Sequence, residues 1–101
     1  MKKINKKELL EVMKEDKYNV FIFYNLLCKR CTDYLKYLEY HPVGKDFHII
    51  NIKEDLLFYF KEIGQLMPVT IITKNEDLVY YKVGNLSGEK LNELLKILEE
   101  N

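Results

Sequence analysis

Apolar residues recur along the chain at two different spacings, which predict four helices and four strands. Helical spacing, with apolar residues three and four positions apart, begins near Asn5, Cys28, Glu54 and Ser87 and ends near residues 17, 40, 63 and 98. Runs rich in β-branched and aromatic residues predict strands at residues 20–24, 47–52, 69–73 and 78–83. The first run is apolar throughout, which is typical of a central strand buried on both faces.

Short polar motifs mark the ends of the predicted helices. Asn5 and Glu8 have the spacing of a capping box, in which each side chain accepts a hydrogen bond from the other's backbone N–H. Ser87 is a favourable N-cap for the last helix, and Gly64 suits the end of the third. The second helix must end before Pro42, because the residue before a proline avoids the α region.

The order of the predicted elements indicates an α/β fold. Residues 74–77 link the last two strands, and so short a link is sufficient only for an antiparallel hairpin. The earlier strands alternate with helices, which produces a mixed sheet with helices on both faces. We therefore predict a single domain, residues 1–101. Its mixed central sheet has four strands, or five if residues 2–4 add an edge strand, and four helices flank it.

Composition and charge exclude several classes of function. The chain carries 16 basic and 16 acidic residues, and this balance argues against a nucleic-acid partner. Three closely spaced tyrosines could stack on single-stranded nucleic acid, but Tyr34, Tyr37 and Tyr40 lie along a predicted helix, and the zero net charge also argues against this role. No stretch approaches the roughly 20 apolar residues of a membrane helix, and the basic residues 1–7 do not precede a signal-peptide core. We therefore expect no membrane partner and a cytoplasmic location, where a close cysteine pair is rarely a structural disulfide.

The cysteines Cys28 and Cys31 form a C-x-x-C motif that follows a predicted strand and opens a predicted helix. The amides and the macrodipole of a helix N-terminus stabilise an anion, so the pKa of Cys28 should lie below the free value of about 8.5. Lys29 and Arg30, the only arginine in the chain, add positive charge beside this sulfur. Cys31 lies one turn further in. The expected roles are therefore attack on a client disulfide by Cys28 and resolution by Cys31.

Three segments of the chain resemble the thioredoxin family. Residues 21–24 (FIFY) lead into the cysteine motif, residues 67–70 (MPVT) are similar to the loop whose cis-proline faces the cysteines, and residues 83–87 (VGNLS) match the passage from the last strand to the last helix. The order of the predicted elements agrees with that family over nearly the whole chain. The resemblance implies the thioredoxin fold.

The resemblance also implies a thiol–disulfide oxidoreductase that needs no cofactor and no metal. Such a protein acts as a monomer on protein clients that carry disulfides, and it receives electrons from a thioredoxin-type reductase or another donor. A cis Met67–Pro68 bond near the sulfurs is implied, with the backbone around Met67 pairing with an extended client segment. On the same basis, substrate contacts are expected from Tyr24, Leu27, Met67, Pro68 and Gly84.

Several positions depart from the family pattern. The usual Trp before the first cysteine is Leu27, and the usual Gly-Pro between the cysteines is replaced by residues 29–30. Ile22 stands where the family has a buried Asp, and Ile49 stands near the position of its usual Lys partner. Because that carboxylate is thought to relay protons to the second cysteine, we expect slow resolution by Cys31 near neutral pH.

Other uses of the cysteine pair stay open. A zinc site could combine the pair with His41 and His48, although the spacing of the histidines exceeds the usual range. Two chains could also share an iron–sulfur cluster through their cysteine pairs. The chain could instead be a non-catalytic binding module with an apolar docking patch, or a glutaredoxin-like protein that uses glutathione.

Overall fold

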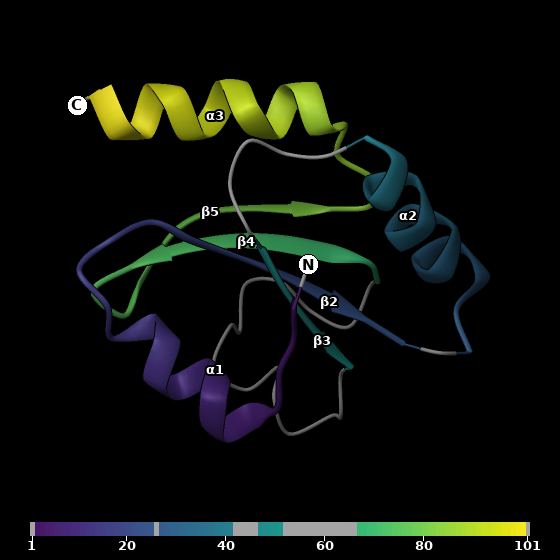
Figure 1. Ribbon diagram of the computed structural model, residues 1–101, viewed down its shortest axis with the longest axis horizontal. Coiled ribbons are helices and arrows are strands. Elements are labelled where there is room, and N and C mark those ends of the chain that lie inside the picture. The colour runs from purple at the N-terminus through teal and green to yellow at the C-terminus, as the bar shows by residue number, and fades with distance from the viewer. Residues whose placement is uncertain (1, 26, 42–46, 52–66, 101) are drawn as a thin grey trace.

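A computed structural model of the protein describes residues 2–25, 27–41, 47–51 and 67–100. Over these residues, five strands form one sheet that is accompanied by three helices (Figure 1). The elements follow one another as β1 (Lys2–Lys3), α1 (Lys6–Met13), β2 (Asn19–Tyr24), α2 (Lys29–Tyr40), β3 (Phe47–Asn51), β4 (Val69–Lys74), β5 (Asp77–Val83) and α3 (Gly88–Glu100). In this part of the chain, no helix combines the length and the apolar character needed to span a membrane.

The sheet is mixed, with the strand order β1-β3-β2-β4-β5. Strands β1 and β2 both run parallel to β3, whereas β4 runs antiparallel to β2 and to β5. The α/β class and the mixed sheet predicted from the sequence are therefore confirmed. The optional edge strand is present as β1, which pairs Lys2 with His48. The fourth predicted helix, residues 54–63, lies outside the described residues.

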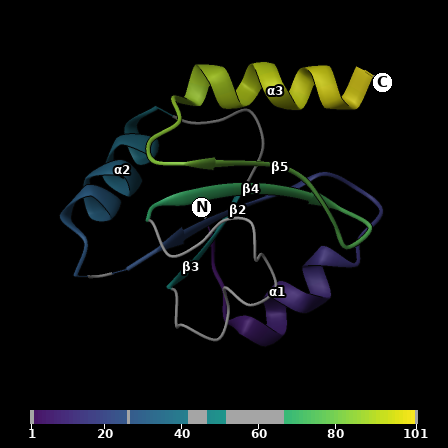
Figure 2. The ribbon, with the colours of Figure 1, turned by 180° about the vertical axis from the view of Figure 1, so that it is seen from behind.

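The side chains of the central strand β2 alternate between two apolar layers, as the pleat of a strand requires. Phe21 and Phe23 pack in one cluster with residues of α1. Val20 and Ile22 pack on the other face, in a cluster that draws on both α2 and α3. Figures 1 and 2 show α1 below the sheet and α3 above it in both views. All six residues of β2 are buried, as the apolar run predicted.

Helix α1 begins at the predicted capping box but ends earlier than predicted. The backbone N–H of Glu8 donates to Asn5 Oδ1 over 2.9 Å, and the reciprocal bond to Glu8 Oε1 is also present. The predicted end near residue 17 is wrong, because the helix stops at Met13. The carbonyl of Met13 accepts a hydrogen bond from the N–H of Glu76, in the turn between β4 and β5. That distant turn binds the C-terminal end of α1.

The hairpin of β4 and β5 confirms the antiparallel pairing predicted from the short link. Asn75 and Glu76 form its two-residue turn, with φ angles of 52° and 69°. Positive φ at both central positions gives a turn whose twist matches that of the flanking strands. The hairpin therefore brings Val83, at the end of β5, beside Val69, at the start of β4.

Helix α3 packs the predicted leucine stripe into the core. Its N-terminus is capped by Ser87, whose Oγ accepts a hydrogen bond from the N–H of Lys90 over 3.1 Å. Leu91 and Leu95 are buried, and the flanking leucines of the stripe pack partly buried against the same cluster. The stripe is therefore a core face of the domain, which is the role that its short length predicted.

We expect the substitution Leu91→Ala to lower the free energy of unfolding by about 2–5 kcal/mol, because it leaves a cavity in a site with no solvent exposure. Ile97→Ala is the matched control on the same helix. Ile97 is 57% exposed, so its loss should change the free energy by no more than about 0.5 kcal/mol. Urea unfolding measures both. Equal effects of the two substitutions would contradict the described packing.

Candidate active site

A tight turn carries the chain from the end of β2 to the first cysteine. The carbonyl of Asn25 accepts a hydrogen bond from the N–H of Cys28 over 3.0 Å, and its side-chain Oδ1 accepts one from the N–H of Leu27 over 2.9 Å. An Asn side chain that bonds the backbone two residues on is typical of such turns. Asn25 thus shapes the approach to Cys28, a role that the sequence analysis did not assign.

Cys28 and Cys31 are joined by a disulfide within the chain, with their Cα atoms 5.2 Å apart. Cys28 is the N-cap of α2, and its sulfur accepts a hydrogen bond from the backbone N–H of Cys31 over 3.1 Å. Cys28 is partly exposed, whereas Cys31 has no exposed surface. The first cysteine of the pair is therefore the more exposed one, and the attack of Cys28 on a client stays a prediction.

The two basic residues between the cysteines differ in their surroundings. The ammonium group of Lys29 lies 3.2 Å from Asp33 Oδ2, one turn further along α2. Both side chains are largely exposed, so this ion pair contributes little to stability, but it offsets the positive charge of Lys29. Arg30 is exposed at the next position. An effect of Lys29 or Arg30 on the pKa of Cys28 stays a prediction, and the pairing with Asp33 favours Arg30 as the stronger of the two.

Pro68 directly precedes β4, the strand that pairs with β2 on one side. The Met67–Pro68 bond is cis, which confirms the prediction from the sequence. Because Phe23 pairs with Val69 in the antiparallel ladder, Pro68 lies near the end of β2 from which the chain turns toward Cys28. The three segments singled out by the resemblance therefore meet at one end of the sheet.

Gly84 completes this arrangement from the end of β5. Its backbone N–H donates to the carbonyl of Pro68 over 2.8 Å. Its φ angle is 92°, a conformation that L side chains rarely adopt, so the backbone itself favours glycine here. A Cβ at this position would meet no atom within 4 Å, which leaves the space beside the backbone open.

The residues expected to contact a substrate differ in exposure. Leu27 is 95% exposed, and Met67 and Gly84 are partly exposed. Pro68 is buried, and Tyr24 is only 4% exposed. Leu27, Met67 and Gly84 are therefore the more accessible of the five residues, whereas Tyr24 and Pro68 are buried. Contact between any of these residues and a client stays a prediction.

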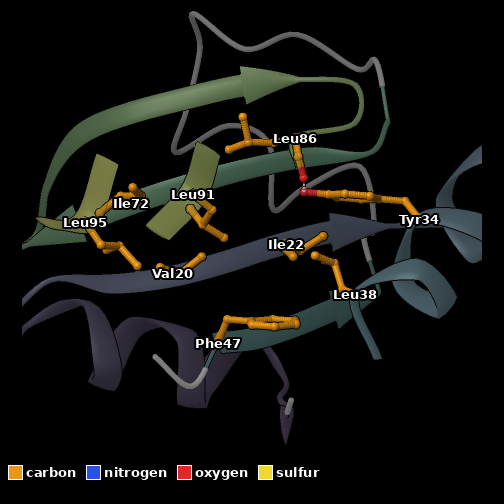
Figure 3. Packing of buried hydrophobic residues seen from close by; sticks show 9 residues of the cluster. All are labelled: Val20, Ile22, Tyr34, Leu38, Phe47, Ile72, Leu86, Leu91 and Leu95. Atoms are coloured by element: carbon orange, nitrogen blue, oxygen red, sulfur yellow. Dashed lines mark hydrogen bonds between the residues drawn. The ribbon is translucent and has the colours of Figure 1, made fainter. Parts of the chain in front are cut away.

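Ile22 and Ile49 stand at or near the two positions where, by the resemblance, the thioredoxin family has a buried Asp and its Lys partner. Ile22 has no exposed surface, and it lies opposite Ile49 in the ladder between β2 and β3. Ile22 belongs to the same apolar cluster as Tyr34 and Leu38 of α2 (Figure 3). The alignment of these positions, inferred from the sequence, therefore agrees with the register of the strands.

Tyr34 is a buried residue to which the sequence assigned no role beyond its place on a predicted helix. It lies on the buried face of α2 together with Cys31 and Leu38. Burial raises the pKa of the Tyr34 phenol above its usual value near 10. The phenol therefore stays protonated at neutral pH and cannot take a proton from Cys31.

The histidines of the alternative zinc site lie away from the cysteine pair. His41 follows α2 at the opposite end from Cys28, and the 12 residues between them span about 18 Å. His48 lies in β3, where its ring stacks on Phe21 with the centroids 5.3 Å apart. Among the described residues, no group of three or more potential metal ligands gathers. The set of two cysteines and two histidines is therefore not assembled.

Comparison with known proteins identifies the fold. No protein-family model and no curated protein sequence matches the chain. Solved structures do match, at low sequence identity. Chloroplastic thioredoxin z is 18% identical with a TM-score of 0.80, and the match covers 100% of this chain and 96% of that one. A thioredoxin from Malassezia sympodialis is 22% identical with a TM-score of 0.73, over 96% and 89% of the two chains.

A third match is a structure described as a complex of ferredoxin:thioredoxin reductase and thioredoxin f2. It is 21% identical with a TM-score of 0.71, over 97% of this chain and 94% of that one. These likenesses show that the chain has the thioredoxin fold. Within this fold, Cys28 and Cys31 form a C-x-x-C pair at the start of α2.

We expect the pKa of Cys28 in the reduced protein to lie below about 8.5, because the N–H of Cys31 and the start of α2 stabilise the thiolate. Thiolate absorbance measured against pH gives this value. Arg30→Ala should raise it more than Lys29→Ala does, since Lys29 already pairs with Asp33. A pKa at or above the free value would contradict the stabilisation, and a larger effect of Lys29→Ala would contradict the assignment to Arg30.

Proposed function

We propose that this protein is a thiol–disulfide oxidoreductase that acts on protein clients through Cys28 and Cys31. One observation carries the proposal: the sulfur of the partly exposed Cys28 caps the N-terminus of α2 and is disulfide-bonded to that of the buried Cys31, one turn away. A purely structural disulfide gains nothing from a reachable sulfur at a helix N-terminus, whereas a nucleophile does.

The proposed reaction transfers two electrons from the reduced cysteine pair to a client disulfide. The Cys28 thiolate attacks one client sulfur, the client S–S bond breaks, and the departing client thiolate takes a proton from water. Cys31 then loses its proton and attacks the sulfur of Cys28. This step forms the Cys28–Cys31 disulfide and releases the second client thiolate. The client is reduced and the pair is oxidised.

The end of the sheet beside Cys28 supplies the proposed client-binding surface. The exposed side chain of Leu27 lies next to the nucleophile, and Met67 and Gly84 present partly exposed backbone segments. An extended client segment can pair with backbone at such a site and place its disulfide against Cys28. Pro68, which has no N–H to donate, lies buried at the edge of this surface.

A reductant must restore the dithiol after each turnover. We propose a thioredoxin-type reductase or another dithiol donor as the source of the electrons. The match to a chain described in a complex with ferredoxin:thioredoxin reductase supports such a partner.

We further propose that the protein works as a cytoplasmic monomer, as inferred from the sequence. Native mass spectrometry and cell fractionation test these two points.

The roles of the two cysteines are tested by single substitutions. Cys28→Ser should abolish reduction of insulin with dithiothreitol as the electron source, because it removes the attacking thiolate. Cys31→Ser should instead accumulate a mixed disulfide between Cys28 and the client, visible on a non-reducing gel and by mass spectrometry. Normal turnover by the Cys31 variant would show that the assigned roles are wrong.

The absence of a carboxylate at Ile22 predicts the pH dependence of the second step. Cys31 has no exposed surface, and burial disfavours its charged form, so we expect a small thiolate fraction near pH 7. Resolution of a preformed mixed disulfide should therefore accelerate as pH rises, by up to about tenfold per pH unit while Cys31 remains mostly protonated. Stopped-flow release of the client thiol measures this rate. Fast resolution that does not change around pH 7 would point to a proton acceptor elsewhere.

A further inference from the structure

The hydroxyl of Tyr34 joins three separate parts of the fold. It donates a hydrogen bond to the backbone carbonyl of Leu86 over 2.8 Å (Figure 3), and it lies 3.3 Å from Oγ1 of Thr70. A phenol has one proton, and a carbonyl can only accept. The proton therefore goes to Leu86, and the hydroxyl of Thr70 is the donor in the second bond. Helix α2, strand β4 and the segment before α3 thus meet at one oxygen.

These bonds lie close to the residues of the proposed client-binding surface. Leu86 is two residues beyond Gly84, and Thr70 is two residues beyond Pro68. Gly84 and Pro68 are themselves linked by the bond from the Gly84 N–H to the Pro68 carbonyl. Tyr34 is one helical turn beyond Cys31, on the same buried face of α2. One hydroxyl therefore connects the helix that carries the cysteines to both backbone segments that would hold a client.

We propose that Tyr34 is a positioning residue, which holds the segment from Gly84 to Leu86 at a fixed place relative to Cys28 and Cys31. The expected effect on clients rests on the proposed function, but the anchoring of the segment from Gly84 to Leu86 can be measured without any client. Tyr34 is 1% exposed, so its hydroxyl gains nothing from water, and the two bonds offset its burial. An apolar ring would fill the same volume without holding Leu86.

A role for Tyr34 in proton transfer is excluded by the same geometry. Its proton lies in the bond to Leu86, and burial keeps the phenol protonated at neutral pH. Its effect on the reaction must therefore pass through the position of the backbone.

The test compares Tyr34→Phe with the wild-type protein. The substitution keeps the ring and removes only the hydroxyl, so the carbonyl of Leu86 loses its donor. The KM for insulin should rise about 2- to 10-fold, the effect of one lost hydrogen bond. The amide of Gly84 should exchange with solvent faster by a similar factor, relative to amides of the central strand β2. Alkylation of Cys28 by iodoacetamide should not change, since Cys31 still donates to its sulfur.

Three further variants separate positioning from stability. Tyr40→Phe makes the same chemical change on α2 at a side chain that is 77% exposed, and it should change nothing. Leu95→Ala weakens the same apolar cluster without touching the bond to Leu86, so it should lower the melting temperature and leave the KM and the relative exchange of Gly84 unchanged. Thr70→Val removes the weaker bond alone and should have a smaller effect than Tyr34→Phe.

Two outcomes would overturn the proposal. The first is a Tyr34→Phe protein whose KM for insulin and exchange rate of the Gly84 amide match those of the wild type. The second is a Leu95→Ala protein in which both quantities change as much as in Tyr34→Phe. That result would show that Tyr34 acts only through stability. If the wild-type protein reduces no protein disulfide, the proposed function fails. The anchoring role is then judged on the exchange of Gly84 alone, where faster exchange in Tyr34→Phe supports it and an unchanged rate overturns it.

Discussion

The hydrogen bond from the backbone N–H of Cys31 to the sulfur of Cys28 fixes the chemistry of the whole site. It makes the first sulfur the cap of α2, so that the unpaired amides of the helix start face this atom. It also places the second sulfur one turn inside the helix, on the face that packs against the sheet. The same contact therefore distinguishes the partly exposed Cys28 at the helix start from the buried Cys31 inside the helix. A pair of cysteines with this spacing in a strand or a loop would not be differentiated in this way.

The strand order brings the rest of the site to that helix start. Because β2 and β4 are antiparallel, the C-terminal end of one lies beside the N-terminal end of the other, and β5 returns to the same end. The opposite end of the hairpin is bound to the last carbonyl of α1, through the N–H of Glu76, and to the segment after α1, where the side chain of Asn75 donates to Asp16 over 2.8 Å. The register of β4 and β5 is thus held at the end remote from the cysteines. This leaves the end with Pro68 and Gly84 available for binding.

Local signals in the sequence were sufficient for most of the fold. The capping box at Asn5, the antiparallel hairpin with its short link and the apolar run of β2 each depend on neighbouring residues, and each is found as predicted, although the link is shorter than the predicted residues 74–77. The end of α1 was predicted wrongly because the group that binds its last carbonyl comes from Glu76, about 60 residues away. No pattern near Met13 contains that information.

Tyr34 escaped prediction for a related reason. Three tyrosines follow one another at intervals of three along α2, and their side-chain chemistry is identical. Tyr34 is 1% exposed, whereas Tyr37 is 37% exposed. The difference arises from a carbonyl and a hydroxyl on distant segments, which give one of these phenols partners inside the core. The helices, the strands and the cysteine motif could be predicted from neighbouring residues in the sequence. The long-range contacts that position the site could not.

The cluster around Ile22 links the stability of the core to the proposed chemistry. A buried pair of charges must be desolvated, and its replacement by apolar residues is often neutral or stabilising. The facing residues Ile22 and Ile49 are both apolar, and the buried phenol of the cluster, Tyr34, has its proton in a bond to Leu86. Among the described residues, none of the buried side chains is a carboxylate. Under the proposed mechanism, we therefore expect the proton of Cys31 to leave to solvent or to the client. On that basis we expect the burial of Cys31 to govern the lifetime of the mixed disulfide, and the start of the helix to govern the reactivity of Cys28.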